Sequence, residues 1–173
     1  MFLFAREIQD VNTSASIVCL NQQTGQVVWE YPIGVFERFN YNPSLSRTAV
    51  AYGRVFAVVN GTLYALDENT GELIWARDNP DRPLSGIPPV VADHRVFVAD
   101  HDYILGLDTD SGEVVWIYAL SGARNPHIVA DGKLFAMNAD SLIAIPEFPF
   151  WVILAIIAVV TVVLALVCRL LRK

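Results

Sequence analysis

One acidic segment has the residue types and spacing that come closest to a metal site. In Asp108-Thr109-Asp110-Ser111-Gly112, carboxylates at alternate positions resemble the start of a calcium-binding loop. An EF-hand loop has Gly at its sixth position and Glu at its twelfth, whereas this sequence has Glu113 and Ala119 there. We therefore interpret these acids as residues of a hairpin turn, and we expect no metal ligand among them.

The histidines and cysteines show no spacing typical of catalysis. Asp100-His101-Asp102 is expected in a solvated turn between two strands, and His94 and His127 have no partner at a recognisable catalytic spacing. Cys19 lies in the polar part of the chain and Cys168 in a long apolar segment, so we do not expect them to pair. The sequence predicts no catalytic residue, no cofactor and no metal site.

A ten-residue segment occurs three times, with a period of roughly 40 residues. Its copies are Leu20–Trp29, Leu66–Trp75 and Leu107–Trp116. Each copy has an Asn or Asp at its second position, a Gly four residues later and a Trp at its end. These structural repeat residues are Asn21, Gly25 and Trp29, then Asp67, Gly71 and Trp75, and then Asp108, Gly112 and Trp116.

Each repeat is predicted to contain short strands separated by turns. Val55–Val59 and Thr62–Leu66 are strand-like, and Asn60-Gly61 between them is a typical two-residue hairpin turn. Asp67–Gly71 is expected to form a five-residue hairpin loop, closed by a glycine with positive φ. Four short strands in roughly 40 residues are typical of a propeller blade, so we predict an all-β fold.

The repeat resembles the PQQ-like β-propeller repeat, whose core is A-x-D-x-x-T-G-x-x-x-W. The second copy matches this core fully, and the similarity covers about residues 17–145. The matching residues are Ala65, Asp67, Thr70, Gly71 and Trp75, then Gly106, Asp108, Ser111, Gly112 and Trp116, and more loosely Cys19, Asn21, Thr24, Gly25 and Trp29. The resemblance implies that each Trp docks against the neighbouring blade, over the small residue and the Gly of the motif.

Quinoprotein dehydrogenases have similar blades, which raises an enzymatic alternative. The resemblance implies that such enzymes hold a quinone on the axis of a complete propeller, with Ca²⁺, a catalytic Asp and often an adjacent pair of cysteines. This sequence has no Cys-Cys pair. We therefore expect a non-catalytic propeller without cofactor. The alternative is the C-terminal part of a quinoprotein-like dehydrogenase whose catalytic blades lie elsewhere.

The repeats predict a partial β-propeller of four-stranded blades. Whole blades are expected at 48–79 and 88–120, a half-blade at 17–34 and a three-stranded piece at 126–145, while residues 1–16 form a poorly defined segment. Propellers close with four to eight blades. Either this sequence is part of a longer protein, which we favour, or several copies complete one ring.

The C-terminal region predicts a single transmembrane helix at 150–171, after a Pro-rich juncture at 146–149 and before a basic tail at 172–173. Phe150–Cys168 contains Thr161 as its only polar residue, and its length matches the hydrocarbon core of a bilayer. All acidic residues lie before this segment. An acidic domain argues against nucleic acid as a partner, and a basic C-terminus is expected to stay in the cytoplasm.

Pro146-Glu147-Phe148, directly before the apolar segment, resembles the PEF-type C-terminal sorting signals of archaeal surface proteins. The resemblance implies cleavage there; the alternative is that the helix persists as the anchor. Asn12 and Asn60 begin N-x-Ser/Thr sequons, which are glycosylation sites if the domain is extracellular. We expect a single-pass, cell-surface propeller that binds the membrane and other surface proteins or glycans.

Overall fold

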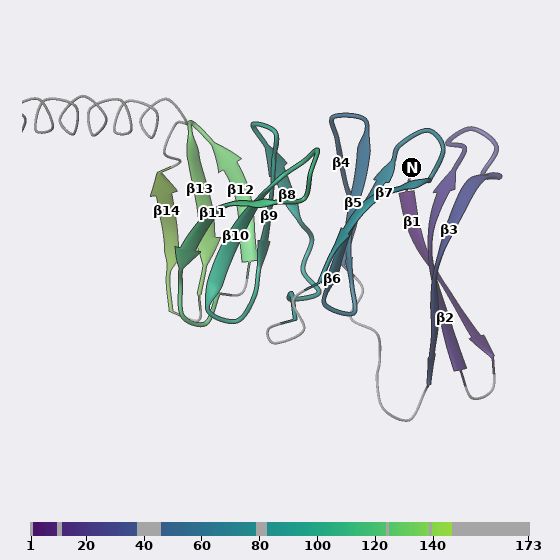
Figure 1. Cartoon of the computed structure of the whole chain (residues 1–173), viewed down its shortest axis with the longest axis horizontal. Coiled ribbons are helices and arrows are strands. Elements are labelled where there is room, and N and C mark those ends of the chain that lie inside the picture. Colours follow the sequence, from purple (N-terminus) through teal and green to yellow (C-terminus); the bar gives the residue numbers. More distant parts are fainter. Residues whose placement is uncertain are drawn as a thin grey trace, which may run out of the picture.

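The computed structural model describes residues 2–9, 12–37, 46–78, 83–123, 125–138 and 140–146. These residues form four small antiparallel sheets, which follow one another in chain order from right to left in Figure 1. We call the sheets blades A to D. The all-β prediction is confirmed for the described residues.

Blades B and C have four strands each, and blades A and D have three. Blade A contains β1 (Phe2–Gln9), β2 (Asn12–Leu20) and β3 (Val27–Glu37). Blade B contains β4 (Ala49–Ala51), β5 (Arg54–Val59), β6 (Thr62–Asp67) and β7 (Leu73–Arg77). Blade C contains β8 (Val90–Ala92), β9 (Arg95–Ala99), β10 (Tyr103–Asp108) and β11 (Val114–Ala119). Blade D contains β12 (Asn125–Ala130), β13 (Lys133–Met137) and β14 (Leu142–Pro146).

Blades B, C and D occupy the segments in which the repeat predicts them. The N-terminal region differs, because β1 and the first part of β2 run through the range 1–16, for which the sequence indicated no element. The two strands pair continuously from Phe2 with Cys19 to Gln9 with Asn12. Arg6-Glu7 in the middle of β1 interrupts the apolar pattern that marks β5 and β9, so no blade strand could be recognised there.

The core lies between the blades, because each sheet packs face to face with its neighbour. In β5, Val55 and Ala57 belong to an apolar cluster shared with blade A, whereas Phe56 and Val58 belong to a cluster shared with blade C. All four side chains are fully buried. This strand is therefore apolar from Val55 to Val59, as expected for a strand covered on both faces.

The first strands of successive blades lie next to one another, β4 beside β8 and β8 beside β12. They form the inner side of the array, and the tryptophan strands β7 and β11 form the outer edges of their sheets. The turn at Asn60-Gly61 has positive φ at both residues, as predicted for a two-residue hairpin. A Cβ added at Gly61 would lie 2.6 Å from Cβ of Pro83, so a larger residue does not fit there.

Candidate functional site

The repeat motif forms a hairpin loop whose polar side chain binds its own backbone. One carboxylate oxygen of Asp67 accepts hydrogen bonds from the backbone N–H groups of Asn69 and Thr70, both at 2.8 Å. Gly71 closes the loop with φ of 74° and donates its N–H to the carbonyl oxygen of Asp67. These backbone hydrogen bonds lower the pKa of Asp67, because they favour the charged carboxylate.

The same loop occurs after β10 and β2. Asp108 accepts hydrogen bonds from the backbone N–H groups of Asp110 and Ser111, and the hydrogen bond from Ser111 lowers the pKa of the Asp108 carboxyl. Asn21 makes the equivalent bonds through its amide oxygen. The carboxylate that suggested a calcium loop is therefore a turn acceptor, which agrees with the hairpin interpretation.

The tryptophans connect successive blades. The indole nitrogen of Trp29, in blade A, donates a hydrogen bond of 3.0 Å to the carbonyl oxygen of Glu68 in blade B. Its ring lies over Gly71, where an added Cβ would be only 2.5 Å from the ring atoms. This geometry agrees with the docking that the family resemblance implied.

Trp75, in blade B, docks on blade C in the same way. Its indole nitrogen donates to the carbonyl oxygen of Thr109 at 3.0 Å, and a Cβ added at Gly112 would lie 2.7 Å from its ring. Both glycines are required for two reasons, their positive φ and the close approach of the ring. We call such a loop a tryptophan-docking hairpin. Its glycine lies under the indole ring, and the residue after the Asp accepts the indole N–H at its carbonyl oxygen.

Trp116 has a different environment. It contacts Phe97 edge-to-face and stacks on Tyr118, with ring centroids 5.9 Å apart in both pairs. In the register of blade D, Pro146 pairs with Lys133, as Asp67 pairs with Arg54 in blade B. Pro146 therefore stands where a docking hairpin would begin, and the described part of blade D has no such hairpin.

Two further contacts join blades B and C. Arg54 forms an ion pair with Asp110 at 2.7 Å, and the rings of Tyr52 and His94 stack with centroids 4.2 Å apart. His94, which lacked a catalytic partner in the sequence, thus has a structural partner. The Asp110 side chain is 67% exposed, so we expect the ion pair to stabilise the fold only slightly.

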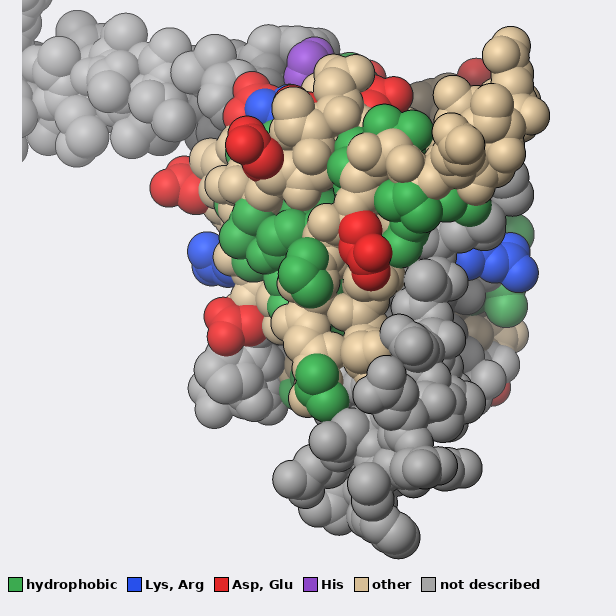
Figure 2. Space-filling model, turned by 90° about the vertical axis from the view of Figure 1, so that its right-hand side faces the viewer, with side chains coloured by type: hydrophobic (Ala, Val, Ile, Leu, Met, Phe, Trp, Pro, Cys, Tyr) green, Lys and Arg blue, Asp and Glu red, His purple; other side chains and the backbone are tan. Residues whose placement is uncertain are grey.

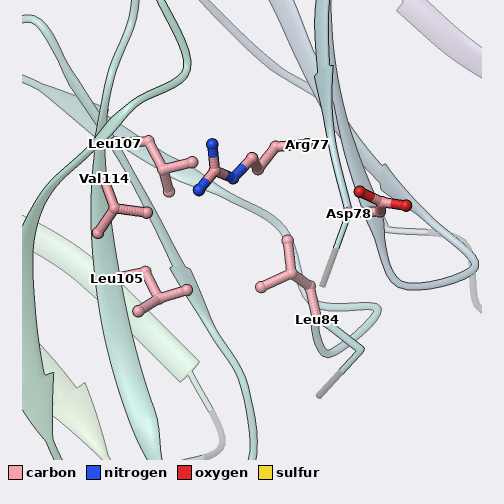
Figure 3. Close-up of a pocket in the computed structure, with 6 residues that line it drawn as sticks. All are labelled: Arg77, Asp78, Leu84, Leu105, Leu107 and Val114. Atoms are coloured by element: carbon pink, nitrogen blue, oxygen red, sulfur yellow. The ribbon is translucent and has the colours of Figure 1, made fainter. Parts of the chain in front are cut away.

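A cavity of about 210 Å³ lies between blades B and C. Its walls have both apolar and polar parts, and Figure 3 shows Arg77 reaching across it while Asp78 points away. The apolar lining residues are Leu84, Leu105, Leu107 and Val114. At the interface between blades A and B, Tyr31 holds the position of Arg77, two residues after the Trp, and its ring lies 6.3 Å from that of Tyr64.

The remaining acidic segment also forms a turn. Asp100 is buried, and its carboxylate accepts hydrogen bonds from the backbone N–H groups of Asp102 and Tyr103 at 2.8 and 2.7 Å. Within the described ranges, no three His, Cys, Asp or Glu side chains are grouped as metal ligands. Of the two cysteines, Cys19 is a free, partly buried thiol, and Cys168 lies outside the described residues.

The sequons and the sorting motif are only partly covered by the described residues. Asn60 is exposed at the tip of its hairpin turn, whereas Asn12 begins β2 and its side chain is not described. Pro146 ends β14, but Glu147, Phe148 and the predicted transmembrane segment lie outside the described residues. Among the residues that the structure covers, no helix has the length and apolarity needed to cross a bilayer.

Solved structures that resemble this chain are only distantly related to it in sequence. BamB from Moraxella catarrhalis has a TM-score of 0.53 and 20% identity, over 80% of this chain and 46% of that one. The quinohemoprotein alcohol dehydrogenase ADHIIG from Pseudomonas putida HK5 has a TM-score of 0.48 and 18% identity, over 66% and 20%. A protein of unknown function from Bacteroides caccae has a TM-score of 0.48 and 15% identity, over 85% and 58%.

This chain therefore spans less than two thirds of the length of each of these proteins. At 20% identity, the likeness to BamB from Moraxella catarrhalis shows the fold alone. No curated protein matches the sequence. The family model described as outer membrane protein assembly factor BamB matches residues 59–146, which is half of the chain and includes blades C and D. On this match and the repeated tryptophan docking, the chain belongs to the PQQ-like, BamB-type β-propeller repeat family.

Proposed function

We propose that this chain is a non-catalytic binding or scaffold module, anchored to the membrane at the cell surface. One observation carries the proposal: the polar groups of the repeat are used inside the fold. Asp67 and Asp108 bind the backbone of their own turns, and the indole nitrogens of Trp29 and Trp75 bind carbonyl oxygens of the next blade. The motif residues therefore hold the blades together, and we propose that partners bind the outer surface of the blades.

The end of the array at blade A supports a binding role. Val27 and Val28 of β3 are more than half exposed, at 58% and 57%. Figure 2 views this end of the molecule and shows hydrophobic side chains gathered on its surface. Exposed apolar surface beside polar residues is typical of protein-binding sites. Other surface proteins are therefore the partners that we propose first, with glycans as the alternative.

Photo-crosslinking in native membranes tests the binding role. A photoreactive residue replaces Val28 in one variant and Val50, which is 40% exposed on β4 of blade B, in the control. We expect protein crosslinks from position 28 and few from position 50. Equal crosslinking at both positions, or none at position 28, would argue against blade A as a binding surface.

The membrane anchor rests on the apolar run Phe150–Cys168 and the basic residues Arg169, Arg172 and Lys173. The proposed topology keeps these basic residues in the cytoplasm and the blades outside. Protease added to intact cells should therefore reach the blades, and an inaccessible propeller would contradict the topology. Intact-mass analysis separates the two fates of the segment. A species ending at Lys173 means that the helix persists, and loss of the segment after Pro146-Glu147-Phe148 means processing.

The non-catalytic role has its own test. The full chain, purified in detergent, is incubated with PQQ and Ca²⁺ and then dialysed. We expect no stoichiometric quinone absorbance to remain. Stoichiometric retention would instead support the quinoprotein-like alternative.

A further inference from the structure

The interface between blades B and C has an arginine at a position that holds a tyrosine in the neighbouring interfaces. This position lies two residues after the tryptophan of the repeat, and it is Tyr31 in blade A, Arg77 in blade B and Tyr118 in blade C. The ring centroids of Tyr31 and Tyr64 are 6.3 Å apart, and Tyr118 packs against the apolar cluster between blades C and D. Between blades B and C, Arg77 extends instead across the cavity of about 210 Å³ (Figure 3).

The register of blade B directs Arg77 into this cavity. Arg77 pairs with Leu63, which belongs to the apolar cluster shared with blade C. Side chains of directly paired residues lie on the same face of a sheet, so Arg77 also faces blade C. Figure 3 shows its guanidinium directed toward Leu107 on the opposite wall. The cavity therefore contains a positive charge that enters from blade B.

Asp78 also lines the cavity, but its carboxylate points away from it (Figure 3). Burial raises the pKa of the Tyr64 hydroxyl, and repulsion from Asp78 adds a smaller increase, which places this carboxylate near the face that blade B turns to blade A. Within the described residues, no carboxylate forms an ion pair with Arg77 and no acceptor forms a hydrogen bond with its guanidinium. The guanidinium is therefore open to an anion that enters the cavity.

Aliphatic side chains from blade C and from the segment between the blades provide the apolar part of the lining. They are Leu84, Leu105, Leu107 and Val114. Leu84 and Leu107 are buried, with exposed fractions of 4% and 1%. The N–H of Leu84 donates to the carbonyl oxygen of Gly61 at 3.1 Å, and the N–H of Ser85 donates to that of Ala99 at 2.8 Å. Because these bonds tie the segment to both blades, the apolar wall is formed before any ligand binds.

The volume of the cavity suits a small organic molecule. In proteins, a cavity of about 150 Å³ with apolar walls takes up benzene. At about 210 Å³, the cavity between blades B and C has room for a body of that size and one polar group. An arginine binds a carboxylate through two parallel N–H···O hydrogen bonds, which select this anion by shape as well as by charge.

We propose that this cavity is a binding site for a small monocarboxylic acid with an apolar body, such as an arylacetic acid. The carboxylate accepts hydrogen bonds from the guanidinium of Arg77, and the body packs against Leu105, Leu107 and Val114. This inference goes beyond the binding role proposed above and does not depend on it, because that role concerns protein partners at the end of the array formed by blade A.

A set of four small ligands tests the chemistry of the site. Phenylacetate, its neutral amide phenylacetamide and the cation phenethylammonium share a phenyl ring, and acetate lacks it. The full chain, with ¹³C-labelled Leu and Val methyl groups, is held in lipid nanodiscs, and NMR follows the methyl signals during each titration. We expect saturable shifts at Leu105 and Val114 with phenylacetate. The other three ligands should bind at least about tenfold more weakly, because each loses either the charged hydrogen bonds or the apolar contact.

Three variants of the chain test the geometry. Arg77→Gln removes the charge and should weaken the binding of phenylacetate at least about tenfold. Arg47→Gln is the matched control, because it changes the net charge equally at an exposed residue outside the cavity lining, and it should bind as the wild type does. Leu105→Tyr introduces the residue found at the equivalent position of blade B, Tyr64, and should block the cavity although Arg77 is kept. If this variant fails to fold, phenylacetate against phenylacetamide on the wild-type chain still decides.

Three outcomes would overturn the inference: no saturable shift at Leu105 or Val114, equal binding of phenylacetate and phenylacetamide, or equal effects of Arg77→Gln and Arg47→Gln. A peptide that ends in Phe and binds at least about tenfold more tightly than phenylacetate would assign the cavity to a protein C-terminus, and it would also overturn the inference. A flat titration with phenylacetate leaves the proposed binding role in place, because the crosslinking test of that role concerns Val28 in blade A.

Discussion

The indole nitrogen of Trp75 donates a hydrogen bond to the carbonyl oxygen of Thr109, 34 residues later in the chain and in the next blade. The ring simultaneously covers Gly112, which closes the same hairpin. One side chain therefore fixes both the distance between two blades and the position of a loop. Trp29 repeats this arrangement with Glu68 and Gly71, so the repeat period in the sequence becomes a repeated interface in the fold.

Replacing Gly112 by Ala should separate steric overlap from backbone strain. The new Cβ would lie 2.7 Å from the ring of Trp75, so the ring or the hairpin must move. We expect the free energy of unfolding to fall by about 1–3 kcal/mol more than in Gly53→Ala, the cost typical of overpacking. Gly53→Ala carries comparable left-handed strain without a neighbour. Denaturant titration measures both, and equal losses in the two variants would show that the ring is not tightly docked.

The sequence alone predicts the blades well because the motif encodes local and non-local contacts together. Asp67, Thr70 and Gly71 specify the turn by their own hydrogen bonds and φ, and Trp75 marks the outer strand. Blade A was only half recognised, since β1 has no motif and is defined by its pairing with β2. The sequence of the motif does not show which hairpin glycines lie under a ring: Gly71 and Gly112 do, whereas an added Cβ at Gly25 meets nothing within 4 Å.

The acid limb of the stability profile should depend on the turn carboxylates. Hydrogen bonds lower the pKa of Asp67 and Asp108 in the folded chain, so their contribution to stability is present above the unfolded value of about 4 and is lost as pH falls through the folded pKa. Asn21 makes the same turn with an amide that does not titrate.

The double variant Asp67→Asn/Asp108→Asn should therefore keep its hairpins and lose stability less steeply below about pH 4. Thermal melts between neutral pH and the acid limb measure the difference. Asp131→Asn, in the turn between β12 and β13, removes an acidic group outside the motif and serves as the control. An unchanged acid slope in the double variant would mean that other groups govern acid unfolding.

Thr109 carries a buried hydroxyl that has no hydrogen-bond partner among the described residues. Its backbone is fully used, with the N–H bound to the carbonyl of His94 and the carbonyl bound to Trp75. Thr109→Val keeps the shape and removes the unpaired hydroxyl, so we expect a gain of about 1 kcal/mol in the free energy of unfolding. Thr109→Ser keeps the hydroxyl and loses the methyl group, and it should be less stable than wild type. A destabilised Val variant would reveal a partner for the hydroxyl.

The interface with the cavity beside Arg77 differs from its equivalent between blades A and B at two positions: Arg77 replaces Tyr31, and Leu105 replaces Tyr64. Tyr31 fills the corresponding position between blades A and B with a ring close to that of Tyr64, whereas Arg77 extends across an open space of about 210 Å³ lined by Leu105 and Leu107. Sequence comparison shows the exchange of Tyr for Arg, but the direction of the arginine side chain and the space beneath it appear only in the structure (Figure 3).

Arg77→Tyr should fill this space and bring the interface of blades B and C closer to that of blades A and B. Filling a cavity with an apolar group typically raises stability by about 0.5–2 kcal/mol, and we expect a gain in that range. Arg77→Ala is the control, because it removes the charge without adding volume. Denaturant titration of both variants decides between packing and charge: if Arg77→Ala gains as much as Arg77→Tyr, removal of the arginine charge rather than the filled cavity explains the effect.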